Sequence, residues 1–278
     1  MTKTQLQKYE AFKALHYRGR AVVVPNAWNA GSARILAALG FEALASTSAG
    51  YAFQVGRRDS CGALSRGEII ANAAEIAEAS GLPVSGDLEN GFGPAPEAVA
   101  QTIRDAIAAG LVGGAIEDAS GDKARPIYDM GLAVERIAAA ADAARGRFML
   151  TARSENFITG NPDLRDTIAR LQAFSAAGAD VLYAPGLPDI AAIRTICAEV
   201  DKPVNVVMGL SGGSYSVEEL SAAGVARIST GGSLARAALG GFLRAAQEVR
   251  GQGTFSYASE ALSDGEAQSY MAGPESRD

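Results

Sequence analysis

The chain has 278 residues, of which 48% are hydrophobic and 20% are charged, and it carries a net charge of −6 with a pI near 5.0. There is no cluster of Lys and Arg and no apolar run long enough to span a bilayer, so we expect no nucleic-acid and no membrane partner. The polar N-terminus lacks the apolar core of a signal peptide, and Cys61 and Cys197 have no ligand spacing. We therefore expect a cytoplasmic protein.

Short apolar runs alternate with alanine-rich amphipathic stretches along the chain. Eight of these runs are typical of buried parallel strands: 21–24, 43–46, 84–87, 114–117, 148–152, 181–184, 204–207 and 226–229. The segments between them have helical spacing, for example 97–109 and 163–177, and Gly110 and Gly178 stand where helix C-terminal caps belong. Eight such repeats predict a (β/α)₈ TIM barrel, which typically takes about 250 residues. A doubly wound open sheet is the alternative, although its glycine-rich fingerprint is absent after the first strand.

The domain organisation follows from the same pattern. We expect a single-domain barrel over residues 1–250 and a polar C-terminal tail over residues 251–278, with a helical extension at this end of the chain. The stretch 233–249 has helical spacing and is expected to pack on the barrel, with a helix that contacts a partner chain as the alternative. Two strand-to-helix connections, 47–64 and 119–130, are long, and loops of that length often act as lids or binding loops.

Ionisable residues end the third, fourth and fifth predicted strands. Asp87 and Glu89 follow the third strand, Glu117 and Asp118 the fourth, and Arg153 ends the fifth, two residues before a further glutamate. These strand ends meet at one mouth of a barrel. Carboxylates gathered there repel one another, and a hard cation such as Mg²⁺, which prefers oxygen ligands and retains several waters, would relieve the repulsion. The structural alternative is that the acids pair with the arginine or cap helices.

Three further residues bear on the chemistry. Arg153 offers a planar fork for a substrate carboxylate, and it could also be a salt-bridge partner of Glu117 or of the glutamate two residues on. Asp59, in the 47–64 loop, taken by itself is typical of a solvated loop acid. The one histidine, His16, precedes the first strand and is expected at the surface, so neither a His-based triad nor a zinc centre is available.

Five short motifs occur in order along the chain: Ser48-Ala49-Gly50, the Gly-x-x-Asp-Ser run ending at Asp59-Ser60, the run from Asp87 to Gly93, Ile116-Glu117-Asp118 and Ala152-Arg153-Ser154-Glu155. With these motifs the chain resembles the isocitrate lyase/phosphoenolpyruvate mutase superfamily over nearly its whole length. The resemblance implies a Mg²⁺-dependent enzyme, with Mn²⁺ as the alternative ion, that stabilises the enolate of a 2-oxo acid.

The resemblance also implies roles for individual residues. Asp87 would bind the metal directly, Glu89 and Glu117 would hold metal-bound waters, and Asp59 would approach the metal site. Lys123 matches a lysine of the family's mobile gating loop, whose ammonium could stabilise developing charge. Our catalytic set is therefore Lys123, Arg153, Glu117 and Asp59. The substrate-binding set is Ser46, Ser48, Ala49, Gly50, Arg153 and Asn205.

The gating loop departs from the subgroups of that family. It reads Lys123-Ala124-Arg125-Pro126-Ile127-Tyr128, without the Lys-Arg-Cys-Gly-His of isocitrate and methylisocitrate lyases or the Asn or Thr and Ser of phosphonate-handling members. We expect a lyase or decarboxylase that acts on C–C bonds of a small 2-oxo or 2-hydroxy di- or tricarboxylate. The alternatives are P–C chemistry of the phosphoenolpyruvate mutase or phosphonopyruvate hydrolase type, and a binding protein that captures a 2-oxo acid without turnover. The family further implies a homo-oligomer, a dimer or a tetramer.

Overall fold

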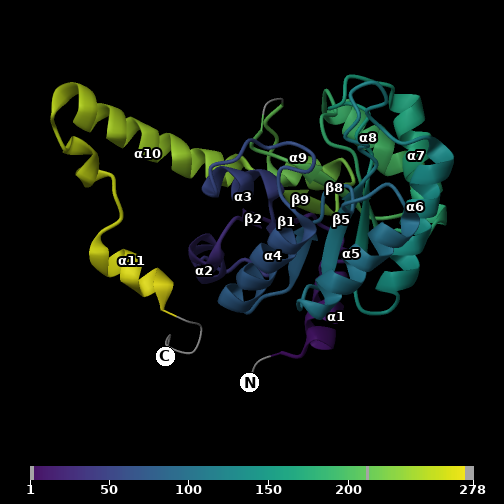
Figure 1. The fold of residues 1–278 in the computed structure, drawn as a ribbon, viewed down its shortest axis with the longest axis horizontal. Helices are drawn as coiled ribbons and strands as arrows, with labels where there is room; N and C mark the ends of the chain where they lie inside the picture. The colour runs from purple at the N-terminus through teal and green to yellow at the C-terminus, as the bar shows by residue number, and fades with distance from the viewer. Residues whose placement is uncertain (1–2, 211–212, 273–278) are drawn as a thin grey trace.

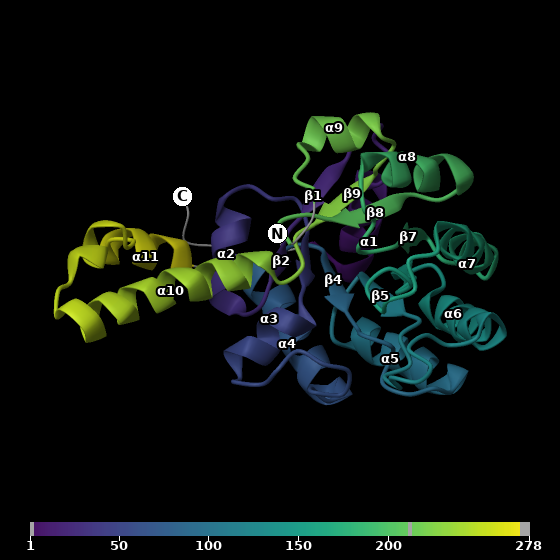
Figure 2. The same ribbon diagram turned by 90° about the horizontal axis from the view of Figure 1, so that it is seen from above.

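The computed structural model describes residues 3–210 and 213–272, which form a closed parallel barrel surrounded by helices (Figures 1 and 2). Its strands are β1 (Val22–Val24), β2 (Asn26–Ala27), β3 (Leu44–Ser46), β4 (Val84–Asp87), β5 (Gly113–Glu117), β6 (Met149–Arg153), β7 (Val181–Tyr183), β8 (Val204–Val207) and β9 (Arg227–Ser229). They pair in the order β1-β9-β8-β7-β6-β5-β4-β3-β2. The predicted single-domain barrel is confirmed, and every predicted strand lies within one residue of its observed bounds.

The first barrel strand is divided in two at Pro25, which has no backbone N–H to donate. Its first half, β1, pairs with β9, and its second half, β2, pairs with β3, so the two halves together close the barrel. The Asn26 side chain joins the two edges: its Oδ1 accepts from the backbone N–H groups of Thr230 and Gly231 at 2.9 and 2.8 Å, and its Nδ2 donates to the Ser46 carbonyl at 2.6 Å. Counting β1 and β2 as one divided strand, the barrel has eight strands, as predicted.

Most of the helices cover the outside of the barrel, whereas α10 (Ser233–Gln252) and α11 (Asp264–Met271) project from it (Figure 2). The other described α-helices are α1 (Gln5–Leu15), α2 (Ala30–Ala38), α3 (Ser48–Gln54), α4 (Arg66–Ser80), α5 (Pro96–Ala108), α6 (Met130–Ala144), α7 (Leu164–Ala176), α8 (Ile190–Glu199) and α9 (Val217–Ala222). Gly110 and Gly178 follow α5 and α7 with φ of 90° and 105°, the left-handed conformation that the sequence predicts there. Among the helices in the described ranges, none combines the length and the hydropathy needed to cross a membrane.

Helix α1 closes the bottom of the barrel, at the N-terminal ends of the strands. Phe12 is fully buried and packs so close to Gly113 that a Cβ there would lie 2.8 Å from its ring. His16 lies beside it, 5% exposed, with Nδ1 2.9 Å from the Phe12 carbonyl oxygen. The expectation that His16 is a surface residue was wrong, because α1 folds under the barrel and covers it. Burial and the charge of Arg227 lower the pKa of His16 to about 3.

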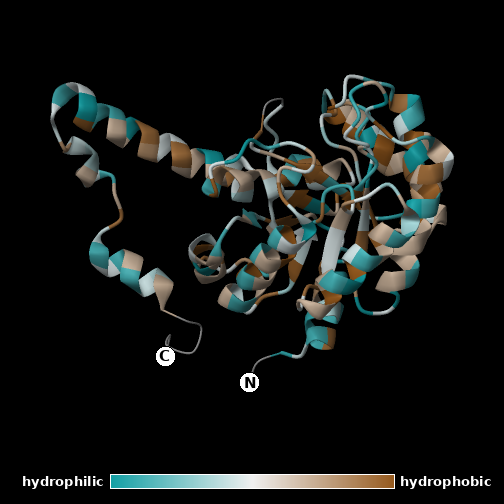
Figure 3. Ribbon diagram, viewed as in Figure 1, coloured by the Kyte–Doolittle hydropathy of each residue, from teal (hydrophilic) through white to brown (hydrophobic). Residues whose placement is uncertain are grey.

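Helix α10 leaves the barrel and points outward (Figure 1). Its one buried residue is Ala235, near its start, so the expectation that this helix packs along the barrel was wrong beyond its first turns. Large apolar side chains on α10 are exposed, and brown segments alternate with teal and pale ones along its ribbon in Figure 3. The chain then returns through α11, where the Met271 carbonyl accepts a hydrogen bond from Arg34 of α2. The last residues of the predicted tail, 273–278, lie outside the described residues.

Candidate active site

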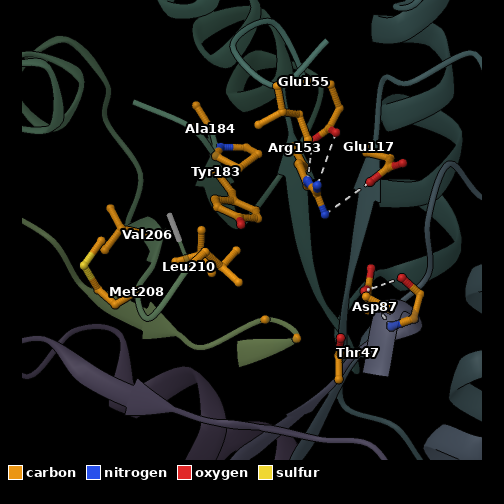
Figure 4. Close-up of a pocket in the computed structure, with 18 of the residues that line it drawn as sticks. Thr47, Asp87, Glu117, Arg153, Glu155, Tyr183, Ala184, Val206, Met208 and Leu210 are labelled. Atoms are coloured by element: carbon orange, nitrogen blue, oxygen red, sulfur yellow. Dashed lines mark hydrogen bonds and ion pairs between the residues drawn. The ribbon is translucent and has the colours of Figure 1, made fainter. Parts of the chain in front are cut away.

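A cavity of about 490 Å³ opens at the C-terminal ends of the strands. The ionisable side chains that line it are Asp59, Asp87, Glu89, Glu117, Arg153 and Glu155, together with Cys61, Tyr183 and Tyr215. Five of these six charged groups lie at the ends of β4, β5 and β6 or within two residues after them, and Figure 4 shows Glu117, Arg153, Glu155 and Asp87 on one side of the pocket. Active sites of barrel enzymes lie at this end. The cavity is therefore the candidate active site.

Asp87, the last residue of β4, is held by the beginning of α3. Its Oδ2 accepts hydrogen bonds from the backbone N–H of Ser48 at 2.9 Å and from the Ser48 hydroxyl at 2.8 Å. Its own N–H donates to the Ser46 hydroxyl at 2.9 Å. Thr47 caps α3 with a bond to the Gly50 N–H, which fixes the direction of that helix. These bonds orient the carboxylate toward the cavity that it lines.

Glu89 sits in a backbone conformation that is rare for residues with a side chain. Its φ is +48°, and its side chain is buried beside Asp87. Burial, followed by the charge of Asp87, raises the pKa of Glu89 to about 7, against a hydrogen bond from the Gly62 N–H. Its Oε2 atom is buried and has no hydrogen-bond partner among the residues that the structure describes. A strained, unsatisfied carboxylate of this kind is typical of a functional site.

Arg153 lies between two glutamates. Its Nη1 atom is 3.2 Å from Oε2 of Glu117, the residue opposite it on β5, and its Nε and Nη2 atoms bind both oxygens of Glu155. Its guanidinium also lies over the Tyr183 ring at 5.2 Å. Burial and the neighbouring carboxylates Glu155 and Asp87 raise the pKa of Glu117, although Arg153 opposes this. The guanidinium thus compensates both glutamates, and Arg153 also belongs to the cavity lining.

The predicted site residues divide into two groups. Those that line the cavity are Ser48, Ala49, Asp59, Asp87, Glu89, Glu117 and Arg153. Asp59 lies among them on the 47–64 loop, where the residue is exposed as expected of a loop acid, and desolvation and the charge of Asp87 raise its pKa. Those outside the lining are Ser46, Gly50, Lys123 and Asn205.

The four predicted site residues outside the cavity lining make different contacts. Ser46 is buried and holds the Asp87 backbone. Gly50 is packed so tightly that a Cβ would lie 2.7 Å from the Thr47 side chain. Asn205 is buried below the cavity, where its Oδ1 accepts from Arg227 at 2.8 Å and its Nδ2 donates to Ser229 at 3.1 Å. Lys123 is exposed on the 119–130 loop.

Some residues that position the site from behind belong to none of the sequence motifs. Arg136 of α6 is fully buried and donates to the backbone carbonyls of Asn90, Gly93 and Pro94, which follow the Asp87–Glu89 segment. It also stacks on Tyr128 of the 119–130 loop, 4.3 Å from the ring centre. An arginine on the buried stripe of a helix was the signal that could have found it.

Asp118 also has a positioning role. It points away from the cavity, pairs with Arg170 at 3.1 Å and accepts from the Glu155 N–H at 2.8 Å. The bond ties the end of β5 to the backbone of Glu155, so it helps to align Glu117 and Arg153 across the two strands.

The chemistry of the acids fits a hard divalent cation. The unsatisfied Glu89 oxygen is an acceptor that a water of the ion's hydration shell would satisfy. Burial, and after it the neighbouring carboxylates, raise the pKa values of Glu89 and Glu117, and a cation would offset both effects. Within residues 3–210 and 213–272, no three Asp, Glu, His or Cys side chains form a ready-made set of direct ligands. This arrangement suits an ion such as Mg²⁺ that takes one carboxylate directly and keeps its other waters.

A family sequence model and solved structures both match this chain. Residues 12–250 match the sequence model of the phosphoenolpyruvate phosphomutase family. A crystal structure described as a "putative lyase/mutase" from Burkholderia cenocepacia J2315 is 55% identical, with a TM-score of 0.94 and coverage of 97% of each chain. A "putative phosphonomutase" from the same organism is 36% identical, with a TM-score of 0.77 and coverage of 87% of this chain and 99% of that one.

Curated relatives are more distant. An uncharacterized protein of Mycobacterium tuberculosis (strain ATCC 25618 / H37Rv) is 33% identical over 80% of this chain and 81% of its own length. The 2,3-dimethylmalate lyase of Eubacterium barkeri is 34% identical over 59% of this chain and 58% of its own. The oxaloacetate decarboxylase of Marinomonas sp. (strain MWYL1) is 27% identical over 90% and 88%.

Proposed function

Because the chain belongs to the phosphoenolpyruvate mutase/isocitrate lyase superfamily, we propose that it is a Mg²⁺-dependent lyase or decarboxylase. It acts on a C–C bond of a small 2-oxo or 2-hydroxy di- or tricarboxylate. The observation that carries the proposal is that Asp87, Glu89 and Glu117 line one cavity with Arg153. The names of the 2,3-dimethylmalate lyase and the oxaloacetate decarboxylase place their substrates in the same chemical class, which supports the proposal.

The site residues have distinct roles in this proposal. Asp87 would hold Mg²⁺ directly and Glu89 and Glu117 through waters, and the ion when bound would supply Lewis-acid stabilisation of negative charge on a 2-oxo acid. Arg153 binds the substrate carboxylate from its place in the cavity lining, while its two glutamate partners hold the guanidinium in position. Ser48 and Ala49 bind the same carboxylate from α3, and Asp59 approaches the metal site from the 47–64 loop.

Lys123 requires a movement to reach the substrate. It is exposed on a hairpin closed by a bridge between Ala119 and Ile127, and Ala119 lines the cavity. Closure of this hairpin over bound substrate would exclude water and bring the ammonium toward the charge that develops in the reaction.

A substrate panel tests the proposal. The purified protein is incubated with Mg²⁺ and with oxaloacetate, citramalate and malate, and the release of pyruvate or glyoxylate is measured. We expect turnover of at least one acid, with loss of activity in Asp87→Ala and after metal chelation. The control Glu97→Ala removes an exposed carboxylate of α5 and should leave turnover unchanged. No turnover by the wild type, or equal activity in Asp87→Ala, would contradict the proposal.

P–C chemistry on phosphoenolpyruvate or phosphonopyruvate is the second candidate. It is favoured by the description of the matching family and by the 36% identical relative. Against it, Arg153 is the one Lys or Arg side chain among the described residues that line the cavity, and a phosphonate dianion beside these acids calls for more positive charge. Phosphorus NMR of the same incubations separates the two candidates, since P–C chemistry yields a new phosphorus resonance.

We also propose that the protein forms a homo-oligomer. Helix α10 extends from the barrel and exposes Leu239, Phe242 and Leu243, which are 45%, 73% and 55% exposed. Apolar side chains gathered on one projecting element mark a surface for association. A second copy of the chain is the partner, as a dimer or a tetramer.

A further inference from the structure

The cavity has a second half that carries no charge. The lining contributed by β7, β8 and the segments that follow them includes Tyr183, Leu187, Ile193, Val206, Met208 and Leu210. Figure 4 shows Val206, Met208 and Leu210 grouped together, across the pocket from Glu117 and Asp87. All the Asp, Glu, Lys and Arg side chains of the described lining precede β7 in the chain. We call the six residues the apolar wall.

The apolar wall is part of the folded core. Ile193 and Val206 are buried within the main hydrophobic cluster, and Leu187 and Met208 pack against it. Tyr215, which also lines this half, uses its hydroxyl oxygen to accept a hydrogen bond from the Ile190 N–H at 3.1 Å. The wall is therefore preformed, and the Tyr215 hydroxyl beside it already accepts a hydrogen bond.

The position of Arg153 decides which part of a substrate meets this wall. Arg153 stands between the acids and Tyr183, a member of the wall, with its guanidinium 5.2 Å from the Tyr183 ring centre. A substrate whose carboxylate binds Arg153 therefore extends its remaining substituent over the wall. A second carboxylate at that place would lose its hydration without gaining a partner, whereas an alkyl group would leave water for an apolar surface.

We propose that the natural substrate is a 2-oxo or 2-hydroxy di- or tricarboxylate that also carries an aliphatic substituent, and that the apolar wall binds this substituent. The proposal rests on the function proposed above, because that function places the oxo-acid end at Arg153 and the metal site. It goes further by assigning Met208, Val206 and Leu210 as residues that determine specificity.

A homologous series of acids tests the proposal on the intact protein with Mg²⁺. Binding of pyruvate and its straight-chain 2-oxo homologues up to 2-oxohexanoate is measured by calorimetry, and 2-oxoglutarate serves as the member with a distal carboxylate. Turnover of malates with 2-alkyl or 3-alkyl groups of increasing length is measured in parallel. We expect affinity or kcat/KM to rise about 4-fold for each methylene until the wall is covered. We expect 2-oxoglutarate to bind more weakly than 2-oxohexanoate.

Two variants connect the effect to the wall. Leu210→Lys places a cation at the rim, where Leu210 is 41% exposed, and should reverse the preference between 2-oxohexanoate and 2-oxoglutarate by at least 10-fold. Met208→Gln keeps the side-chain length and should flatten the dependence on chain length. The control Leu39→Lys introduces the same change at an exposed leucine at the end of α2 and should leave both preferences unchanged.

The outcomes separate this inference from the function on which it rests. Binding or turnover of the short acids with no gain along the series, or a preference for 2-oxoglutarate in the wild type, overturns the inference and leaves the proposed function standing. If no acid of the panel binds or reacts, the proposed function is overturned and the inference falls with it. A preference that Leu210→Lys and Met208→Gln leave unchanged overturns the assignment of the wall.

Discussion

Glu117 and Arg153 stand opposite each other at the ends of β5 and β6 and form an ion pair of 3.2 Å across the mouth of the barrel. Glu155 holds the same guanidinium from the other side. One buried cation therefore compensates two carboxylates that face a third, Asp87. Arg153 thus supplies positive charge to a cluster of acids. Without it, only a bound cation would offset their mutual repulsion.

Replacing Arg153 by methionine tests this compensation. We expect Arg153→Met to lower the free energy of unfolding by about 3–5 kcal/mol, because two mostly buried carboxylates lose their partner. Urea unfolding measures the change. The double variant Arg153→Met/Glu155→Gln should recover part of the loss, because it removes one unpaired charge. Equal stability of Arg153→Met and the wild type would contradict the role of Arg153 as the counter-charge of the site.

Arg136 holds the loop that carries Glu89, although the two residues are far apart in the sequence. Its guanidinium donates to three backbone carbonyls after Glu89. We expect Arg136→Met to cost about 3 kcal/mol of unfolding free energy and to weaken binding of Mg²⁺, because buried carbonyls lose their donors. Arg145→Met, at the exposed end of α6, is the control. A variant as stable as this control, with unchanged Mg²⁺ affinity by calorimetry, would exclude the positioning role.

The barrel could be predicted well from the sequence because each barrel strand is marked by a local pattern of residues. Runs such as 84–87 and 204–207 are buried on both sides and are bounded by turn residues, so their positions depend little on the rest of the fold. The motifs at strand ends also predicted that Asp87, Glu89, Glu117 and Arg153 line one pocket, since parallel strands in a barrel end together.

The contacts of single side chains could not be predicted in the same way. Asn205 was expected to bind substrate, yet its amide is used by Arg227 and Ser229, residues that follow it by more than twenty positions. Arg136 and His16 are buried through contacts with distant segments, and their own neighbours in the sequence do not reveal this. The direction of α10 likewise depends on what covers its apolar side chains. From the sequence pattern alone, the helix could pack either on the barrel or on a partner chain.

His16 makes stability depend on pH in a predictable direction. Its folded pKa, about 3, is below its ordinary value near 6.5, so the unfolded chain binds the proton more readily. Its contribution is complete above about pH 6.5 and is lost as the pH falls toward 3. Between pH 7 and pH 4, the wild type should lose about 3 kcal/mol relative to His16→Gln, which keeps a donor for the Phe12 carbonyl but does not titrate. Urea unfolding at both pH values measures this, and parallel losses in the two proteins would contradict it.

The hairpin that carries Lys123 should close when substrate binds. We expect Mg²⁺ together with an accepted 2-oxo acid to slow tryptic cleavage after Lys123 by at least 5-fold, because a closed hairpin packs against the cavity. Cleavage after Arg145 provides the internal control, because this residue is exposed at the end of the barrel opposite the cavity. Mass spectrometry of the fragments over time measures both rates. The same rate after Lys123 with and without ligand would argue against a gating loop.

The apolar side chains of α10 make a direct prediction about assembly. Phe242 is 73% exposed on a helix that touches the barrel near Ala235, so an aspartate at this position should not disturb the fold of one chain. If a second copy covers this face, Phe242→Asp should shift the mass measured by light scattering from that of an oligomer toward that of the 28.5 kDa monomer. Leu6→Asp, at a 59% exposed position of α1, is the matched control and should keep the mass of the wild type. A monomeric wild type, or an oligomer that Phe242→Asp leaves intact, would show that α10 is not the surface of association.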